Sequence, residues 1–148
     1  MKIRIGSILI FSFLLLASCG PEKKAMKNFK MGKYENVIQY YTDVLEKQPN
    51  NAKANYYVAE SFRLSNRIPE AEKFYAKASG PGINSDSVAL YYAKSLQANG
   101  KYEEAKTVLN ELQSETKDEV MRTRARKELD GLNYVNKLDE KKNYYKIK

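Results

Sequence analysis

The 148-residue chain contains no histidine and only one cysteine. Without histidine it lacks the side chain that most often serves as a general base or a metal ligand. A single cysteine cannot form a disulfide within the chain. The sequence also has no glycine-rich phosphate loop, nucleophile elbow or metal-ligand cluster. Adjacent acids such as Glu103 and Glu104 are better explained as a solvated helix face than as an acid–base pair. We therefore expect no enzyme, no catalytic residues, no metal site and no cofactor.

Basic residues outnumber acidic ones by 26 to 18, which gives a net charge of +8. This balance is compatible with an acidic polymer or surface as a partner. Nucleic acid is not expected, because the sequence has no zinc-finger, RRM or KH signature and begins with an export signal. With 43% hydrophobic and 30% charged residues, the chain has the length and composition of one modest domain.

The first eighteen residues predict that export signal. Lys2 and Arg4 give a basic start, and residues 5–16 form an apolar run of twelve. As a helix this run would span about 18 Å, which is short of the roughly 30 Å hydrocarbon core of a bilayer. We therefore interpret residues 1–18 as a signal peptide and not as a membrane-spanning helix.

The end of the apolar run, Leu16-Ala17-Ser18-Cys19, resembles a bacterial lipobox. The resemblance implies that Cys19 is the lipid attachment site and the first residue of the mature protein. An ordinary signal peptide with an unrelated cysteine is the alternative. The cysteine is followed by a glycine and not by the aspartate that marks inner-membrane retention in enteric lipoproteins. The resemblance therefore favours a lipid-anchored protein of the outer membrane that faces the periplasm.

Six kinds of position recur at a spacing of 34 residues. Small residues, turn residues and larger apolar residues keep this spacing in three copies: Ala25, Ala59 and Ala93; Gly32, Asn66 and Gly100; Tyr34, Ile68 and Tyr102; Val37, Ala71 and Ala105; Tyr41, Tyr75 and Leu109; Val44, Ala78 and Leu112. In each copy the apolar residues follow a helical period that the turn interrupts, which indicates two amphipathic helices. Because one such pair cannot bury its apolar face alone, we expect the copies to stack.

Together with the closing residues Pro49-Asn50-Asn51, this pattern resembles the tetratricopeptide repeat. The resemblance extends from residue 22 to about residue 114. It implies an all-α fold, a right-handed α-α superhelix of about three helix pairs. Residues 79–87 replace the closing residues between the second and third copies without changing the spacing, and Ser85 or Asp86 is expected to cap the next helix.

An apolar stripe at Met121, Ala125, Leu129 and Leu132 predicts a C-terminal capping helix that shields the last repeat. The basic stretch after it is expected to extend this helix briefly and fray, or to lead to a missing domain. The predicted organisation is a lipoprotein signal peptide at residues 1–18, a lipidated N-terminus at 19–21, a repeat domain at 22–132 and a basic tail at 133–148.

In the tetratricopeptide-repeat family, the first helices of successive repeats line a concave groove. The resemblance places seven candidate partner-binding residues there: Phe29, Tyr56, Tyr57, Glu60, Arg63, Tyr91 and Lys94. Tyrosine and arginine are frequent anchors of binding interfaces. The alternative is that one tyrosine of each doublet packs between helices. Helix-face geometry favours packing for Tyr92 and exposure for Tyr56 and Tyr91.

Some members of the family hold the terminal carboxylate of a peptide with a set of Lys and Asn residues. This sequence has Tyr57, Glu60 and Tyr91 where that clamp needs Asn or Lys. The resemblance therefore does not extend to binding of a terminal carboxylate.

The stretches at residues 59–67, 71–78 and 91–93 resemble the N-terminal repeat module of Bacteroidota lipoproteins of the type IX secretion and gliding machinery. In those proteins a β-propeller and a peptidoglycan-binding OmpA-like domain follow the repeats, and neither follows here. We therefore expect an adaptor or scaffold in the cell envelope that binds a protein or peptide and is held to the membrane by its lipid. The alternative is the N-terminal docking module of a larger type IX secretion or peptidoglycan-linked outer-membrane complex.

Lysines recur at helical spacing just after the lipobox, at Lys23, Lys27 and Lys30. Without Lys2 and Arg4 of the signal, the chain has 24 basic and 18 acidic residues. The lysines are interpreted either as contacts to lipid headgroups or as a solvated helix face.

Overall fold

The computed structural model describes residues 19–146 and the side chains of residues 20–134. The predicted signal peptide, residues 1–18, lies outside the described residues, and for Cys19 only the backbone is described. All regular structure between residues 19 and 146 is helical. The helices are α2 Cys19–Lys30, α3 Tyr34–Lys47, α4 Ala52–Leu64, α5 Ile68–Tyr75, α6 Ser85–Ala98, α7 Tyr102–Glu115 and α8 Glu119–Lys146.

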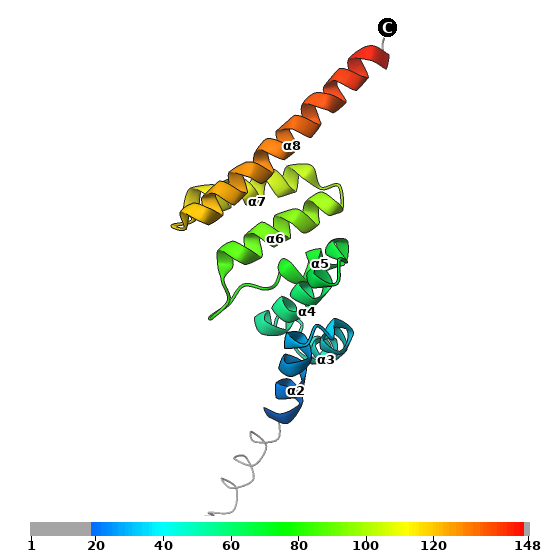
Figure 1. Cartoon of the computed structure of the whole chain (residues 1–148), viewed down its shortest axis with the longest axis vertical. Coiled ribbons are helices and arrows are strands. Elements are labelled where there is room, and N and C mark those ends of the chain that lie inside the picture. The colour runs from blue at the N-terminus through cyan, green and yellow to red at the C-terminus, as the bar shows by residue number, and fades with distance from the viewer. Residues whose placement is uncertain (1–18, 147–148) are drawn as a thin grey trace, which may run out of the picture.

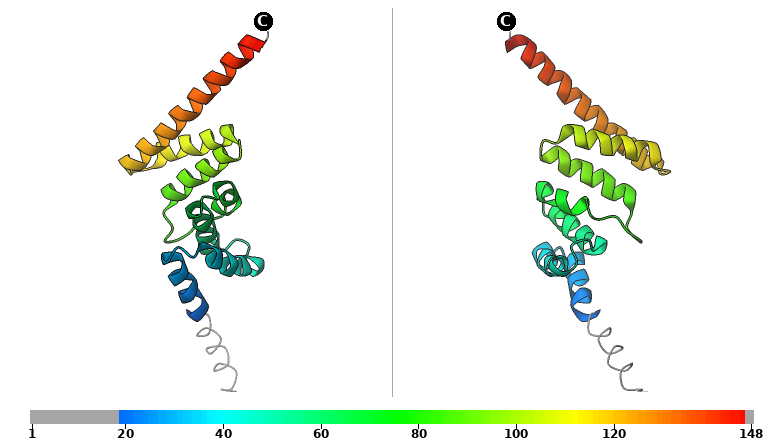
Figure 2. Two further views of the ribbon diagram at one scale, coloured as in Figure 1. Left: turned by 45° about the vertical axis from the view of Figure 1, so that its right-hand side comes forward. Right: turned by 180° about the vertical axis from the view of Figure 1, so that it is seen from behind.

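The helices form a stack of pairs. Each helix packs against the next along the chain, from α2 to α8. Figures 1 and 2 show the pairs α2/α3, α4/α5 and α6/α7 piled in chain order, with α8 on the last pair. The predicted α-α solenoid of three helix pairs and a C-terminal helix is confirmed.

The turn inside each pair has the same geometry. A residue with positive φ begins it in all three copies: Gly32 at 70°, Asn66 at 61° and Gly100 at 75°. The next residue donates its N–H to the carbonyl five positions back: Lys33 to Asn28 at 2.9 Å, Arg67 to Phe62 at 2.8 Å and Lys101 to Leu96 at 2.9 Å. This closure satisfies carbonyls that the end of the first helix leaves free, and only Gly or Asn adopts the required φ readily. The predicted turn positions are therefore confirmed.

Asparagine side chains cap two of the first helices. The Oδ1 of Asn51 accepts the Ala54 N–H at 3.0 Å, and the Oδ1 of Asn84 accepts the Ser87 N–H at 2.8 Å. The expectation that Ser85 or Asp86 caps α6 is wrong. Helix α6 already begins at Ser85, and the Asp86 carboxylate instead accepts a hydrogen bond from a threonine hydroxyl near the end of α7.

Helix α5 is shorter than the pattern predicted. It ends at Tyr75, whereas α3 and α7 each have 14 residues. Pro81 disfavours helical backbone at the residue before it, Gly80. Gly80 also lies close to α4, because a Cβ at this position would be 2.9 Å from the Ala52 Cβ. Ala78 lies beyond the turn that follows the helix, although it is fully buried as expected. The loop changes the length of α5 without shifting the repeat positions that follow.

The small positions at the helix contacts are buried as predicted. Ala59, Ala71, Ala93 and Ala105 are each 0% exposed. The larger residues beside them, such as Tyr75 and Leu109, are buried too, and each stabilises the stack by about 2 kcal/mol. One buried cluster joins α2 to α5 with the start of α6, and a second joins α6, α7 and α8.

Helix α8 packs on α7 through the predicted stripe, since Ala125, Leu129 and Leu132 are buried. The basic stretch after residue 132 was expected to extend this helix briefly and then fray, whereas α8 runs on to Lys146 past the stack (Figure 2). A single glycine, Gly131, costs only about 1 kcal/mol inside a helix, and no proline follows it. Between residues 19 and 146, no helix combines the length and the apolar character needed to cross a membrane.

Candidate functional site

The first helices of the pairs, together with α8, are bridged on one side of the stack. Glu22 of α2 pairs with Lys53 of α4 at 2.7 Å, and Lys94 of α6 pairs with Glu128 of α8 at 2.8 Å. Such partly exposed ion pairs contribute about 0–1 kcal/mol, so their main effect is to orient the helices. We call this surface the inner face; its residues are Glu22, Phe29, Lys53, Tyr56, Tyr57, Glu60, Arg63, Tyr91, Lys94 and Glu128.

Arg63 stands at the centre of the inner face. Its Nη2 and Nε donate to the two carboxylate oxygens of Glu60 at 2.6 and 3.0 Å. Its guanidinium carbon lies 4.1 Å from the centre of the Tyr91 ring, which joins α4 to α6. The hydrogen bonds to Glu60 raise the pKa of Arg63. The bidentate hydrogen bonds to Glu60 and the stacking on the Tyr91 ring hold the guanidinium plane in one orientation.

Glu60 is turned into the stack. It is 7% exposed, and it also accepts a hydrogen bond from the hydroxyl of Tyr75 on α5. Burial, and then this hydrogen bond, raise the pKa of Tyr75. Both carboxylate oxygens of Glu60 bind Arg63, and one also binds Tyr75, so Glu60 positions the groove wall. Contact between Glu60 and a partner stays a prediction.

The aromatic residues form one continuous cluster across α2, α3 and α4. The Tyr57 ring lies 5.3 Å from Tyr41 in a stacked arrangement, and 5.2 and 5.3 Å from Phe29 and Tyr56 edge-to-face. These centroid distances fall in the favourable range for aromatic pairs. Tyr57 is thus the packing centre of the cluster, and Tyr56 lies at its edge.

The tyrosine doublets do not divide into one exposed and one core residue. Tyr56 and Tyr91 are half-buried, where exposure was expected. Tyr92 is half-buried and, as predicted, packs between helices. Tyr92 contacts both buried clusters. Tyr56 and Tyr91 therefore each combine a fixed ring with a part that remains open to solvent.

Lys94 is held by an acid that the candidate set did not include. Glu128 follows Lys94 by 34 residues, as Lys94 follows Glu60, so the repeat spacing was the signal that would have found it. A second omission is Glu22, which binds Lys53 and thereby raises its pKa. The inner-face carboxylates Glu22, Glu60 and Glu128 are each paired with a cation.

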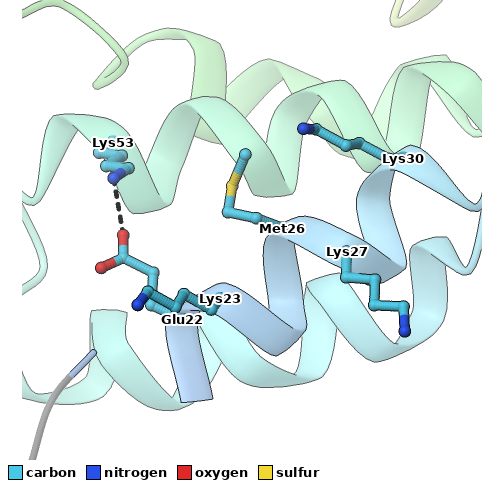
Figure 3. A pocket seen from close by; sticks show the side chains of 6 residues that line it. All are labelled: Glu22, Lys23, Met26, Lys27, Lys30 and Lys53. Carbon is cyan, nitrogen blue, oxygen red and sulfur yellow. Dashed lines mark ion pairs between the residues drawn. The ribbon is translucent and has the colours of Figure 1, made fainter. Parts of the chain in front are cut away.

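We call the contact of Glu60, Arg63 and Tyr91 the Arg63 wall. Two hollows adjoin the inner face, one at Lys53 and one at Lys94. The α2–α4 hollow, of about 490 Å³, is lined by Glu22, Lys23, Met26, Lys27, Lys30 and Lys53 (Figure 3). The α6–α8 hollow, of about 540 Å³, is lined by Ile68, Lys94, Gln97, Ala98, Tyr102, Lys127, Glu128, Gly131 and Leu132. The side-chain amide nitrogen of Gln97 is buried there with no hydrogen-bond partner in the part of the chain that the structure describes.

The chemistry of the inner face is that of a binding surface. Burial raises the pKa of Tyr56, so its hydroxyl is a hydrogen-bond donor at neutral pH and not a base. Within the described residues, no group of three or more His, Cys, Asp or Glu side chains lies together in a way that could hold a metal ion. Flat rings, a fixed guanidinium and two hollows are features that recognise a peptide or protein surface.

Comparison with known proteins identifies the repeats. The TPR repeat-containing protein MJ0263 of Methanocaldococcus jannaschii is 34% identical over 82 residues, which cover 52% of this chain and 26% of that protein. The chain thus spans about a quarter of the length of this curated relative. A solved structure, the first TPR of Spaghetti (RPAP3) bound to the HSP90 peptide SRMEEVD, matches the fold with a TM-score of 0.60 and 22% identity. The match covers 78% of this chain and 89% of that one.

A family model described as Anaphase-promoting complex, cyclosome, subunit 3 matches residues 30–112, which is more than half of the chain. These residues run from the end of α2 to the last buried leucine of α7, and so contain the repeats described above. The chain therefore belongs to the tetratricopeptide-repeat family that this model describes.

Proposed function

We propose that the protein is a membrane-anchored adaptor or scaffold of the cell envelope, which holds a protein or peptide partner on its inner face. The observation that carries this proposal is the Arg63 wall, where Arg63 stacks on Tyr91 and the half-buried Tyr56 lies close by. A binding surface whose side chains are already fixed loses little conformational entropy when a partner arrives. The solved structure with the same fold, which contains a bound peptide, supports the same class of partner.

The proposed partner segment runs along the inner face and places side chains in the two hollows. Its centre meets neutral pairs, because Glu60 and Glu128 compensate Arg63 and Lys94. Tyr57, Glu60 and Tyr91 occupy the positions of the terminal-carboxylate clamp, so an internal segment is favoured over a chain end.

The partner site is tested by cross-linking in intact cells and mass spectrometry of the captured proteins. Tyr56→Ala combined with Tyr91→Ala is expected to reduce capture of the partner strongly, because the double variant lacks both half-buried aromatic rings. Tyr134→Ala is the matched control, since Tyr134 is 64% exposed on α8 away from the wall. Circular dichroism checks that all variants stay helical. Undiminished capture by the double variant would show that this face is not the partner site.

The anchor is proposed at Cys19, with the protein on the periplasmic side of the outer membrane. Its support is the lipobox sequence. Cells grown with a clickable fatty acid are expected to label the wild-type chain and not Cys19→Ala. Equal labelling of the two proteins, or no labelling of either, would contradict the anchor.

The alternative proposal is the docking module of a larger type IX secretion or peptidoglycan-linked complex. It is favoured by α8, which continues beyond the stack to Lys146 and could present or connect a further element (Figure 1). The reading frame downstream of the gene separates the two proposals. An in-frame propeller and OmpA-like domain would favour the docking module.

A further inference from the structure

One face of α2 carries three lysines with no acidic partner. Lys23, Lys27 and Lys30 are spaced by four and three residues, which places them in a row along one side of the helix. All three are exposed, and none forms an ion pair with any residue that the structure describes. We call this row the lysine stripe. It differs from the inner-face cations Lys53 and Lys94, each of which has a carboxylate beside it.

The stripe lies on the solvent-exposed side of α2, where its three lysines line the open α2–α4 hollow. Ala25 lies two residues after Lys23, on the opposite side of α2, and is 3% exposed in the core. Figure 3 shows the lysines on α2 and Glu22 reaching across to Lys53 on α4. This ion pair links the orientation of α2 to that of α4, so whatever the stripe contacts would also orient the repeats.

The proposed lipid anchor, Cys19, lies immediately before the stripe in the sequence. Helix α2 begins at Cys19 itself, so no flexible linker separates the proposed anchor from the stripe. Lys23 rises about 6 Å and Lys30 about 16 Å along the helix from Cys19. The attraction between lysine and an anionic surface acts within about 10 Å, so at least the first lysine lies in range whatever the tilt of α2.

We propose that the lysine stripe docks on anionic phospholipid headgroups, so that α2 lies along the membrane and sets the orientation of the inner face. The inference rests on the proposed anchor. Three ammonium groups in a row on an exposed helix face match a planar array of phosphates, and their long aliphatic stems let the charges reach it. An acidic segment of a protein partner, held in the α2–α4 hollow, is the competing occupant.

The first experiment measures the reactivity of individual lysines. The full chain is purified from membranes and reconstituted in vesicles of phosphatidylcholine, either alone or with added phosphatidylglycerol. An amine-reactive reagent and mass spectrometry report the labelling at each lysine. Labelling of the stripe is expected to fall several-fold when phosphatidylglycerol is present and to recover in high salt. Lys77 and Lys117, which are exposed and outside the stripe, serve as internal controls and are expected to be unchanged.

Equal stripe labelling in the two kinds of vesicle would overturn the inference. So would protection by added poly-glutamate in phosphatidylcholine vesicles without protection by phosphatidylglycerol, because the occupant would then be an acidic peptide. The state of Cys19 is read from the same mass spectra. A lipidated, vesicle-bound chain with a reactive stripe contradicts only this inference, whereas an unlipidated chain contradicts the anchor.

A second measurement uses variants that change only exposed side chains. A fluorophore on Met31→Cys, at the end of the stripe, is expected to be quenched by a headgroup-linked quencher in phosphatidylglycerol vesicles. Lys23→Gln, Lys27→Gln and Lys30→Gln together are expected to abolish most of this quenching. The control pair Lys77→Gln and Lys117→Gln should preserve it. Quenching that survives the triple change would also overturn the inference.

Discussion

At the scale of single residues, Glu60 connects the groove wall to the core. It binds Arg63 on its own helix and receives the Tyr75 hydroxyl from α5, while Arg63 lies over Tyr91 of α6. A nearly buried carboxylate is costly unless such partners surround it. The position of the outer residues Arg63 and Tyr91 therefore depends on an acid that is itself nearly buried.

Glu60→Gln is expected to lower the free energy of unfolding by about 1–3 kcal/mol, because a neutral amide leaves Arg63 without its counter-charge. Arg63 is about a quarter exposed, which keeps the loss below that of a fully buried pair. Urea unfolding followed by circular dichroism measures the change. Glu46→Gln, at an exposed position of α3, is the control and should shift the midpoint little. Similar midpoints for the two variants would contradict the structural role of Glu60.

The buried tyrosines make stability sensitive to alkaline pH. Burial raises the pKa of Tyr41 and Tyr75 above the ordinary value of 10.0, and Glu60 raises that of Tyr75 further. Their stabilisation is complete below pH 10 and is lost as the pH rises above it, because only the unfolded chain then ionises readily. The unfolding free energy should therefore fall above pH 10. Tyr75→Phe should weaken that pH dependence, whereas Tyr102→Phe, at an exposed site, should not.

At the scale of elements, substituting alanine for each of two glycines is expected to change the stability of the protein in opposite directions. Gly100 has a φ of 75° in the turn between α6 and α7, and Gly131 lies inside α8. A Cβ would meet nothing within 4 Å at either position. The two differ only in backbone conformation, which makes them a direct test of the turn geometry.

Gly100→Ala is expected to destabilise the protein by about 1 kcal/mol, because an L side chain strains the left-handed region. Gly131→Ala is expected to stabilise it by about 0.5–1 kcal/mol, because alanine lowers the entropy cost of the helix. Thermal unfolding followed by circular dichroism measures whether each variant is more or less stable than the wild type. A stabilising Gly100→Ala would mean that the turn does not require a positive φ.

At the scale of the whole molecule, each helix is supported mainly by its neighbours in the chain. Helix α4 packs between α3 and α5, whereas α2, at one end of the stack, packs mainly against α3. Stability in such an array is a sum of repeat terms and nearest-neighbour interfaces, so the end of the stack is expected to open before the centre.

Hydrogen exchange is expected to follow this order. Amides of α4 should exchange more slowly than those of α2, because opening α4 disrupts two interfaces. Mass spectrometry of peptides from the two helices measures the difference. Equal protection of α2 and α4 would indicate that the stack opens as a single unit.

Much of this architecture can be predicted from the residues. The repeat positions of Ala59 and Ala93 follow from sequence because helices can approach closely only where side chains are small. Asn66 marks a turn because few residues adopt its φ. The shortening of α5 had its signal in Pro81, although the apolar period through Ala78 outweighed it. The length of α8 was underestimated because the stretch after residue 132 turns basic and tyrosine-rich and was expected to fray.

The candidate site shows where that reasoning stops. The seven residues were placed on one surface by the resemblance to the tetratricopeptide repeat, in which the first helices of successive repeats line a groove. Whether each of these side chains is exposed or already bound within the protein depends on side chains from other helices. Tyr75 donates a hydrogen bond to Glu60, and Glu128 forms an ion pair with Lys94. Those contacts form only when α5 and α8 pack on their neighbours, because the charge and shape of a groove belong to the stack and not to any one helix.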